Sequence, residues 1–217
     1  MSIIRRALMA AVPVTRGLSG LAGLLNGGFA PPLQPDPAQE AAIRAMLPLV
    51  PEMGWTVRAL RQAAGPDADL LFPGGPVEIV ETHSALADRT MAEAAGTLAE
   101  TRLSRRVRAL ILLRLEQAEP DRDAVRRALS LLSLPGHRGA AGRSLARTVD
   151  GIWHAAGDVS SDASRYSKRV LLAGVYSATM LYWLRHGVGP DTEAFLDRRL
   201  AGVARLGNLR RSLIRPR

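Results

Sequence analysis

The sequence predicts an all-α protein built as a single bundle of helices. The chain has 217 residues and is 47% apolar, which is enough to bury a core, but only 4% of its residues are aromatic. Alanine, leucine and arginine recur throughout, and these residues favour helices over sheets. Apolar residues return every three or four positions, and prolines and glycines separate the runs. The length fits one domain.

The positive charge is concentrated at the two ends of the chain. The formal net charge is +9, yet residues 1–35 hold three arginines and residues 198–217 hold seven, with no acidic residue in either segment. This leaves −1 for residues 36–197, so the body is nearly neutral, which is atypical of a nucleic-acid-binding body. The absence of cysteine excludes disulfides, thiolate metal sites and cysteine nucleophiles.

Residues 1–37 predict a basic N-terminal arm and linker. Arg16 and Pro13 interrupt a weakly apolar run that also contains several glycines. A secretory signal needs an unbroken apolar run, so we expect a flexible arm or a partly helical surface anchor instead. The segment PPLQPDP (31–37) indicates a linker.

Residues 38–75 predict a degenerate helix-turn-helix region. Three short helices are expected, over 38–50, 56–64 with Thr56 as N-cap, and 67–72. Their order resembles the N-terminal part of TetR-type regulators. The candidate recognition segment, 65–75, has two aspartates and no arginine, lysine, asparagine or glutamine, so it can neither neutralise phosphates nor read bases.

Residues 76–204 predict the helical body. Helices are expected from about Pro76 to Glu100 and over 104–118, 121–134, 140–155 and 192–204, with a further helix that opens at Ser160-Ser161-Asp162 and ends before Gly187. In that helix the run from Val170 to Leu184 is apolar almost all round. It would rise about 22 Å, against about 30 Å for the hydrocarbon core of a bilayer, so it is too short to span one.

The apolar run has three possible roles, as the central helix of a soluble bundle, as a subunit interface, or as the wall of an apolar cavity. A second apolar run, ALILLRLE (109–116), is its natural packing partner. Together they would form a core in which a long apolar ligand could lie.

Residues 205–217 predict a basic amphipathic tail. If it is helical, this tail suits an anionic membrane surface, and the alternative is a frayed, solvated C-terminus. The candidate membrane-binding residues are Leu206, Leu209, Arg210, Arg211 and Leu213.

No pattern indicates catalysis or a metal site. The glycines match neither a dinucleotide fingerprint nor a phosphate-binding loop, and there is no nucleophile elbow. His154, Asp158 and Asp162 are better explained as a helix boundary around Gly157 than as metal ligands. Glu78 and Glu81 lack the Glu-x-x-His partner of di-iron bundles. We therefore expect no catalytic residues, no metal and no cofactor.

A charged cluster opens the apolar helix. It can be explained as a helix cap with solvated charge, or as a recognition patch, because tyrosine and arginine are favoured at interfaces. Its members are Asp162, Arg165, Tyr166, Lys168 and Arg169.

Four motifs resemble the ubiquinone (coenzyme Q) biosynthesis accessory family, the Coq-nine proteins. In chain order they are LFPGGPVEIVE (71–81), VDGIWHAAGDVSSD (149–162), YSKRVLLAGVY (166–176) and TEAFLDRRL (192–200). Several spaced motifs in one order are more specific than any one of them. The resemblance covers residues 38 to 205 and implies a TetR-like, dimeric, lipid-binding protein in which 76–204 provides the lipid site and the dimer contact.

The resemblance also implies a ligand, a partner and site residues. The ligand is a polyprenylated, isoprenoid quinone precursor, presented to the demethoxyubiquinone hydroxylase or a related ring hydroxylase. Partner-binding residues are Asp162, Arg165, Tyr166 and Arg169, where eukaryotic members carry tryptophan in place of Arg165. The lipid-binding candidates are Leu112, Leu172, Val175, Tyr176, Thr179, Met180 and Trp183.

The sequence thus favours a non-enzymatic lipid-binding accessory protein, peripheral at a membrane and without a nucleic-acid partner. The alternatives are a TetR-type ligand-responsive transcriptional regulator and a structural scaffold with no ligand. The expected location is the cytoplasmic side of the inner membrane in a bacterium, or the matrix side of the inner mitochondrial membrane in a eukaryote, and arginine bias favours the bacterial cytoplasm.

Overall fold

The computed structural model describes residues 33–158 and 164–214, and these contain helices and no strand, which confirms the predicted all-α class. Most of the predicted N-terminal arm and the predicted cap at 160–162 lie outside the described residues. The α-helices are α3 (Pro37–Met46), α4 (Val50–Met53), α5 (Val57–Ala64), α6 (Gly75–Ala94), α7 (Leu103–Gln117), α8 (Arg122–Leu132), α9 (Arg138–Ala156), α10 (Ser164–His186) and α11 (Pro190–Ile214).

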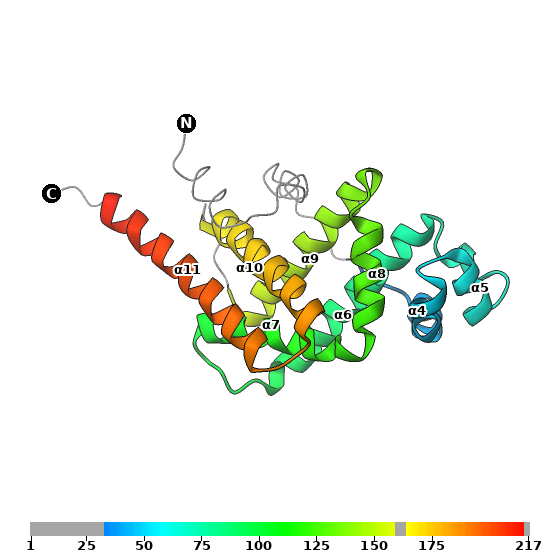
Figure 1. Cartoon of the computed structure of the whole chain (residues 1–217), viewed down its shortest axis with the longest axis horizontal. Helices are drawn as coiled ribbons and strands as arrows, with labels where there is room; N and C mark the ends of the chain where they lie inside the picture. Colours follow the sequence, from blue (N-terminus) through cyan, green and yellow to red (C-terminus); the bar gives the residue numbers. More distant parts are fainter. Residues whose placement is uncertain (1–32, 159–163, 215–217) are drawn as a thin grey trace.

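The helices surround two apolar clusters at opposite ends of the molecule. The N-terminal cluster is built by α3, α4, α5 and α8 with the first half of α6 and the start of α9. The C-terminal cluster is built by α7, α10 and α11 with the ends of α6 and α9. Figure 1 shows α4 and α5 at one end of the molecule and α11 at the other. Because α6 and α9 contribute to both clusters, they join the two ends.

The start of α5 confirms the predicted N-cap. The Thr56 hydroxyl accepts the backbone N–H of Ala59 at 3.1 Å, which satisfies one of the free donors of the first turn. The preceding Trp55 is buried, and its indole N–H donates to the carbonyl of Ala124 in α8 at 2.9 Å. Trp55, next to the cap, therefore holds the start of α5 against α8 in the N-terminal cluster.

The candidate recognition segment contains a single turn of 3₁₀ helix, Ala68–Leu71, and no longer helix. Asp69 in this turn accepts two hydrogen bonds from the Arg61 guanidinium of α5, at 2.9 and 2.7 Å. The pair is exposed, so it adds little stability, but it occupies the Arg61 side chain of α5. A four-residue turn with acidic residues is poorly suited to enter a DNA groove.

Helix α10 contains the apolar run predicted from the sequence and ends where predicted, before Gly187, whose φ of 75° favours glycine. Along the run, α9 and α11 cover more of the helix than α7, the predicted partner. The cover is incomplete, contrary to the expectation for a helix that is apolar all round, because Leu181 is 49% exposed. Within the described residues, no helix is long and apolar enough to cross a membrane.

Helix α11 is longer than predicted. It continues without a break to Ile214, past the predicted end near residue 204. The first ten residues of the predicted tail are thus an extension of this helix, and in Figure 1 its red end lies beyond the other helices.

A buried ion pair joins three helices beside the C-terminal cluster. Arg114 of α7 donates from Nε to Asp88 of α6 at 2.8 Å, and the hydroxyl of Thr148 in α9 donates to the other carboxylate oxygen at 2.9 Å. The side chains of Asp88 and Arg114 are 13% and 9% exposed. Burial raises the pKa of Asp88, and the guanidinium and hydroxyl oppose this shift. One carboxylate oxygen of Asp88 accepts from α7 and the other from α9, so these hydrogen bonds fix the relative positions of α6, α7 and α9.

Removing one partner of this ion pair is expected to lower the free energy of unfolding far more than replacing both partners by apolar residues. Asp88→Ala leaves the guanidinium buried without a carboxylate and should lower the free energy of unfolding by about 3–5 kcal/mol. The double variant Asp88→Leu with Arg114→Met removes both charges and should stay within about 1 kcal/mol of the wild type. Urea unfolding followed by circular dichroism measures both. Equal losses in the two variants would contradict this account of the pair.

A second test concerns His83 of α6, whose ring lies 4.9 Å from that of Trp55. Burial, aided by the charge of Arg114, lowers the pKa of His83 from 6.5 to about 4. The folded state therefore binds fewer protons than the unfolded state between these values, and stability should fall as pH drops from 6.5 towards 4, by about 3 kcal/mol in total. His83→Gln should lose this part of the acid sensitivity in urea unfolding measured across that range. An unchanged pH slope would contradict the assignment.

Candidate functional site

The structure gathers the predicted lipid-binding residues around α10. Leu172, Val175, Tyr176 and Trp183 of α10 are buried in the C-terminal cluster, and Met180 packs against them. Leu112 joins from α7 as a partly buried neighbour. Thr179 is fully buried on α10, and its hydroxyl donates to the carbonyl of Val175 at 2.8 Å, so no polar group of Thr179 is left unsatisfied. The seven residues therefore lie in one apolar region.

Polar contacts fix the C-terminal end of α10. The indole N–H of Trp183 donates to Glu119 at 2.6 Å, and the same carboxylate accepts the backbone N–H of Val188 at 3.2 Å. Arg126 of α8 donates to the carbonyl of Leu184 at 2.8 Å. Glu119 precedes α8, so these contacts tie the end of α10 to the segment around α8. These contacts fix the position of the C-terminal end of α10 relative to α8.

One polar group stands out in the C-terminal cluster. Burial raises the pKa of the Tyr176 phenol, while the nearby charges of Arg114 and Asp88 act on it in opposite directions. Asp88 and Arg114 are not among the residues predicted from the sequence, because they lie on different helices and nothing in the local pattern indicates that they meet. Tyr176 is thus placed where the apolar region borders the buried ion pair.

Of the predicted partner-binding residues, the structure describes the side chains of Tyr166 and Arg169, and these differ in exposure. Tyr166 is 48% exposed, whereas Arg169, three residues later, is 8% exposed. The Arg169 guanidinium is hydrogen-bonded to Asp150 of α9, so it secures the start of α10 against α9. Asp162 and the side chain of Arg165 lie outside the described residues. Of the four predicted residues, Tyr166 is the one whose side chain the structure places at the surface.

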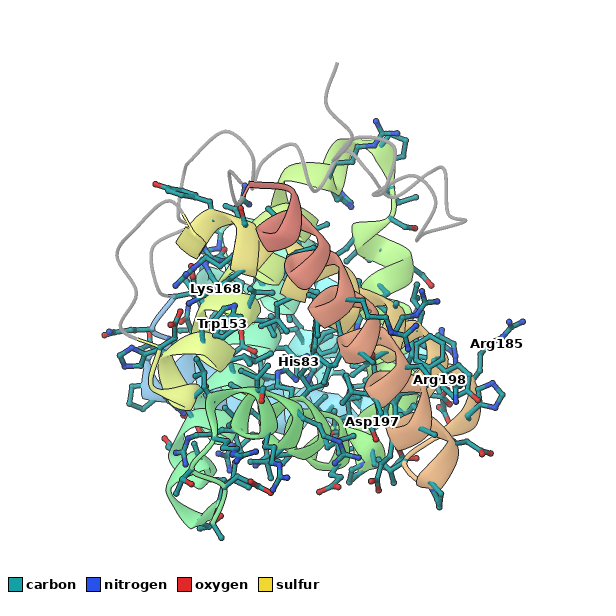
Figure 2. All side chains as sticks on the ribbon, turned by 90° about the vertical axis from the view of Figure 1, so that its left-hand side faces the viewer. His83, Trp153, Lys168, Arg185, Asp197 and Arg198 are labelled. Carbon is teal, nitrogen blue, oxygen red and sulfur yellow. The ribbon has the colours of Figure 1, made fainter. Side chains whose placement is uncertain are left out.

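Lys168 is also engaged with α9. Its ammonium donates to Asp158 at 3.2 Å and lies 5.7 Å from the ring centroid of Trp153. Figure 2 shows Lys168 and Trp153 next to each other. The charged cluster at the start of α10 therefore contributes largely to the contact between α9 and α10. The alternative explanation of the cluster as solvated charge does not fit Lys168 or Arg169.

The predicted membrane-binding residues, 206–213, belong to the last turns of α11. Their side chains lie outside the described part of the chain, so the helical backbone is what the structure adds. The tail is expected to suit a membrane surface only if it is helical, and it is helical as far as Ile214.

The acidic residues considered as metal ligands have structural roles. Glu78 accepts the backbone N–H of Gly74 at 2.6 Å, which satisfies a donor at the start of α6. Glu81 pairs with Arg143 and Arg147 of α9, at 2.9 and 3.0 Å. In the described ranges, no three histidine, cysteine or acidic side chains are grouped so as to hold a metal ion.

Comparison with known proteins identifies the family. The COQ9 family model matches residues 139–207, which include most of α9, all of α10 and much of α11. The mitochondrial ubiquinone biosynthesis protein COQ9-B of Xenopus laevis is 28% identical over 187 residues, covering 78% of this chain and 64% of the relative. The mitochondrial COQ9 of Xenopus tropicalis is 30% identical over 186 residues, covering 78% of this chain and 58% of the relative.

A fungal relative is covered more completely. The mitochondrial ubiquinone biosynthesis protein coq9 of Schizosaccharomyces pombe is 30% identical over 179 residues, covering 76% of this chain and 69% of the relative. The chain thus spans 58–64% of the length of the two Xenopus relatives and 69% of the fungal one. With the family model and the four ordered motifs, these matches show that the chain belongs to the COQ9 family.

Proposed function

We propose that this chain is a non-enzymatic accessory protein of ubiquinone biosynthesis that binds polyprenylated quinone precursors at a membrane surface and presents them to a ring hydroxylase. The observation that carries the proposal is the gathering of the seven predicted lipid-binding residues in one apolar region around α10. The names of its relatives, which are ubiquinone biosynthesis proteins, supply the pathway. The ligand is the bound isoprenoid or quinone-like lipid, and no other cofactor is proposed.

The length of the apolar region along α10 supports a long ligand. α10 alone contributes apolar residues from Leu172 to Trp183, which are 11 residues apart and therefore separated by about 16 Å along the helix axis. This distance suits a chain of isoprene units lying along the helix better than a compact ligand. Tyr176, close enough to Arg114 and Asp88 to be affected by their charges, offers a polar contact within this mostly apolar region.

The location follows from the proposed ligand. A polyprenylated precursor resides in a membrane, so the protein is peripheral to the membrane that holds it, on the cytoplasmic side in a bacterium or the matrix side in a mitochondrion. The three relatives compared above are named as mitochondrial proteins. The basic helical end of α11 provides the membrane contact in this proposal, and the family resemblance favours a homodimer.

The structure offers less support for the regulator alternative. The candidate recognition segment is one 3₁₀ turn, and its Asp69 is paired with Arg61. A regulator would require salt-dependent DNA affinity from this region. A gel-shift titration that found such affinity would favour the regulator.

The lipid proposal is tested by mass spectrometry of organic extracts of the purified protein. Wild-type protein should carry a prenylated aromatic lipid, and Met180→Arg, which places a charge in the apolar region, should carry at least tenfold less. Met53→Arg is the matched control, because Met53 is a partly buried methionine of the N-terminal cluster. It should retain the lipid. Absence of prenylated lipid from folded wild-type protein would refute the proposal.

Docking of the hydroxylase is tested at Tyr166. Because this tyrosine is 48% exposed, Tyr166→Ala should leave the unfolding temperature unchanged. It should weaken binding of the demethoxyubiquinone hydroxylase at least tenfold, or about 1.4 kcal/mol, if the side chain is a central contact. Leu70→Ala, at an exposed position in the 3₁₀ turn at the far end, is the control. Equal affinities of both variants, measured by calorimetry, would rule out docking through Tyr166.

A further inference from the structure

The hydroxyl of Tyr176 has no hydrogen-bond partner among the residues that the structure describes. The side chain is 4% exposed and lies in the C-terminal cluster, on the same face of α10 as Leu172. In this part of the chain, the fully enclosed side-chain atoms that lack a hydrogen bond belong to Gln117, Ser144 and Trp153. The phenol oxygen is therefore not completely enclosed by protein, and it is free to bind a ligand.

Packing alone does not explain a tyrosine at this position. Phenylalanine fills nearly the same volume, and a hydroxyl that moves from water into an apolar region without a new hydrogen bond costs free energy. Thr179, on the next turn of α10, avoids this cost because its hydroxyl donates to the carbonyl of Val175 at 2.8 Å. The hydroxyl of Tyr176 lies at the far end of its ring and makes no such bond to its own helix, so it needs a partner from elsewhere.

Arg114 of α7 brings a second donor close to this hydroxyl. Its Nε donates to Asp88 at 2.8 Å and its Nη2 donates to the carbonyl of Ser84 at 3.4 Å, while no described residue accepts a hydrogen bond from Nη1. The guanidinium and the phenol each act on the pKa of the other, so the two groups lie near each other. Two polar groups thus border the same part of the apolar region.

The charges around these donors favour an uncharged ligand. Burial raises the pKa of the Tyr176 phenol, which therefore stays protonated at neutral pH. Asp88 balances the charge of Arg114, and the nearby Arg147 pairs with Glu81 at 3.0 Å. A carboxylate on the ligand would lose its hydration here without an unbalanced cation to pair with. A neutral oxygen acceptor, such as a quinone carbonyl, needs only the two donors.

We propose that Tyr176 and Arg114 form a subsite for the oxygenated ring of the ligand, in which the Tyr176 hydroxyl and Arg114 Nη1 donate to a ring oxygen of an uncharged prenylated quinone or phenol. The subsite rests on the proposed function, because it lies within the apolar region assigned to the lipid. It disfavours prenylated rings that carry a carboxylate, and so it selects among quinone precursors.

The position of Tyr176 along α10 sets the orientation of the ligand. Leu172 lies four residues before Tyr176 and Trp183 seven residues after it, which correspond to about 6 and 10 Å along the helix axis. The longer apolar stretch thus leads from Tyr176 past Met180 towards Leu181, which is half-exposed. The prenyl chain follows this stretch, so the ring is held inside and the chain points towards the uncovered part of the helix.

The subsite is tested by competition between two lipids for the full chain. The protein is equilibrated with an equimolar mixture of farnesyl-1,4-benzoquinone and farnesene, a hydrocarbon with the same number of isoprene units, and the bound lipids are measured by mass spectrometry. Wild-type protein should prefer the quinone. Tyr176→Phe should lower the ratio of bound quinone to bound hydrocarbon about five- to tenfold, because it removes one hydrogen bond and keeps the aromatic ring.

A second variant removes the guanidinium. Asp88→Leu with Arg114→Met eliminates both charges of the buried pair, so the fold should be kept and the ratio should again fall about fivefold or more. Tyr182→Phe is the matched control, because Tyr182 lies six residues further along α10 and stacks on His186 and Phe195. It should keep the wild-type ratio. Circular dichroism establishes that all variants are folded.

Charge selectivity is tested with a carboxylated ring. Farnesyl-4-hydroxybenzoate at pH 8, where its carboxyl group is ionised, should displace the bound quinone at least tenfold less effectively than unlabelled quinone does, because the buried carboxylate would remain unpaired. Displacement as effective as that by the quinone would overturn the selection of an uncharged ring.

The outcomes separate the subsite from the proposed function. A wild-type ratio in Tyr176→Phe that still binds lipid would overturn the subsite and leave lipid binding intact. Loss of both lipids from folded Tyr176→Phe, with both retained by Tyr182→Phe, would also overturn it, because the hydroxyl would then serve the whole apolar region and not the ring. Wild-type protein that binds neither lipid would refute the proposed function itself.

Discussion

Covering the apolar helix α10 is the constraint on which the rest of the structure depends. Its buried residues, among them Trp183 and Leu172, require apolar neighbours on several sides, and α7, α9 and α11 supply them. Each neighbour brings its own polar groups close to this core. Arg106 of α7 satisfies carbonyls at Ala95 and Ala155, both at 3.0 Å, where α6 and α9 end. The helix ends around the core can therefore be buried without losing hydrogen bonds.

The buried ions serve geometry more than stability. Burial removes water from Asp88 and Arg114 at a cost in free energy, and their mutual attraction offsets that cost, so their net effect on stability is small. A displaced helix would leave one of them unpaired, which is costly. The pair thus penalises alternative arrangements of α6, α7 and α9. The same holds for Arg169 and Asp150 at the start of α10, where the charge first considered for partner binding instead fixes the contact with α9.

The uncovered part of α10 connects the fold to the proposed function. A helix fully enclosed by protein could receive a lipid only if the bundle opened. Leu181 is instead half-exposed near the end of the apolar run, so the folded bundle leaves part of this helix uncovered.

The sequence by itself determined most of the helices, the Thr56 cap and the composition of the apolar region. Local patterns were sufficient, because periodicity, the Thr56 cap and the glycine after α10 act within a few residues. The tertiary structure decided which charges meet. Asp88 and Arg114 are 26 residues apart, and Arg108 and Asp197 are 89 apart, so no local pattern pairs them. Whether an arginine is buried, like Arg169, or exposed, like Arg185, depends on which helix packs against it, and only the folded chain decides that.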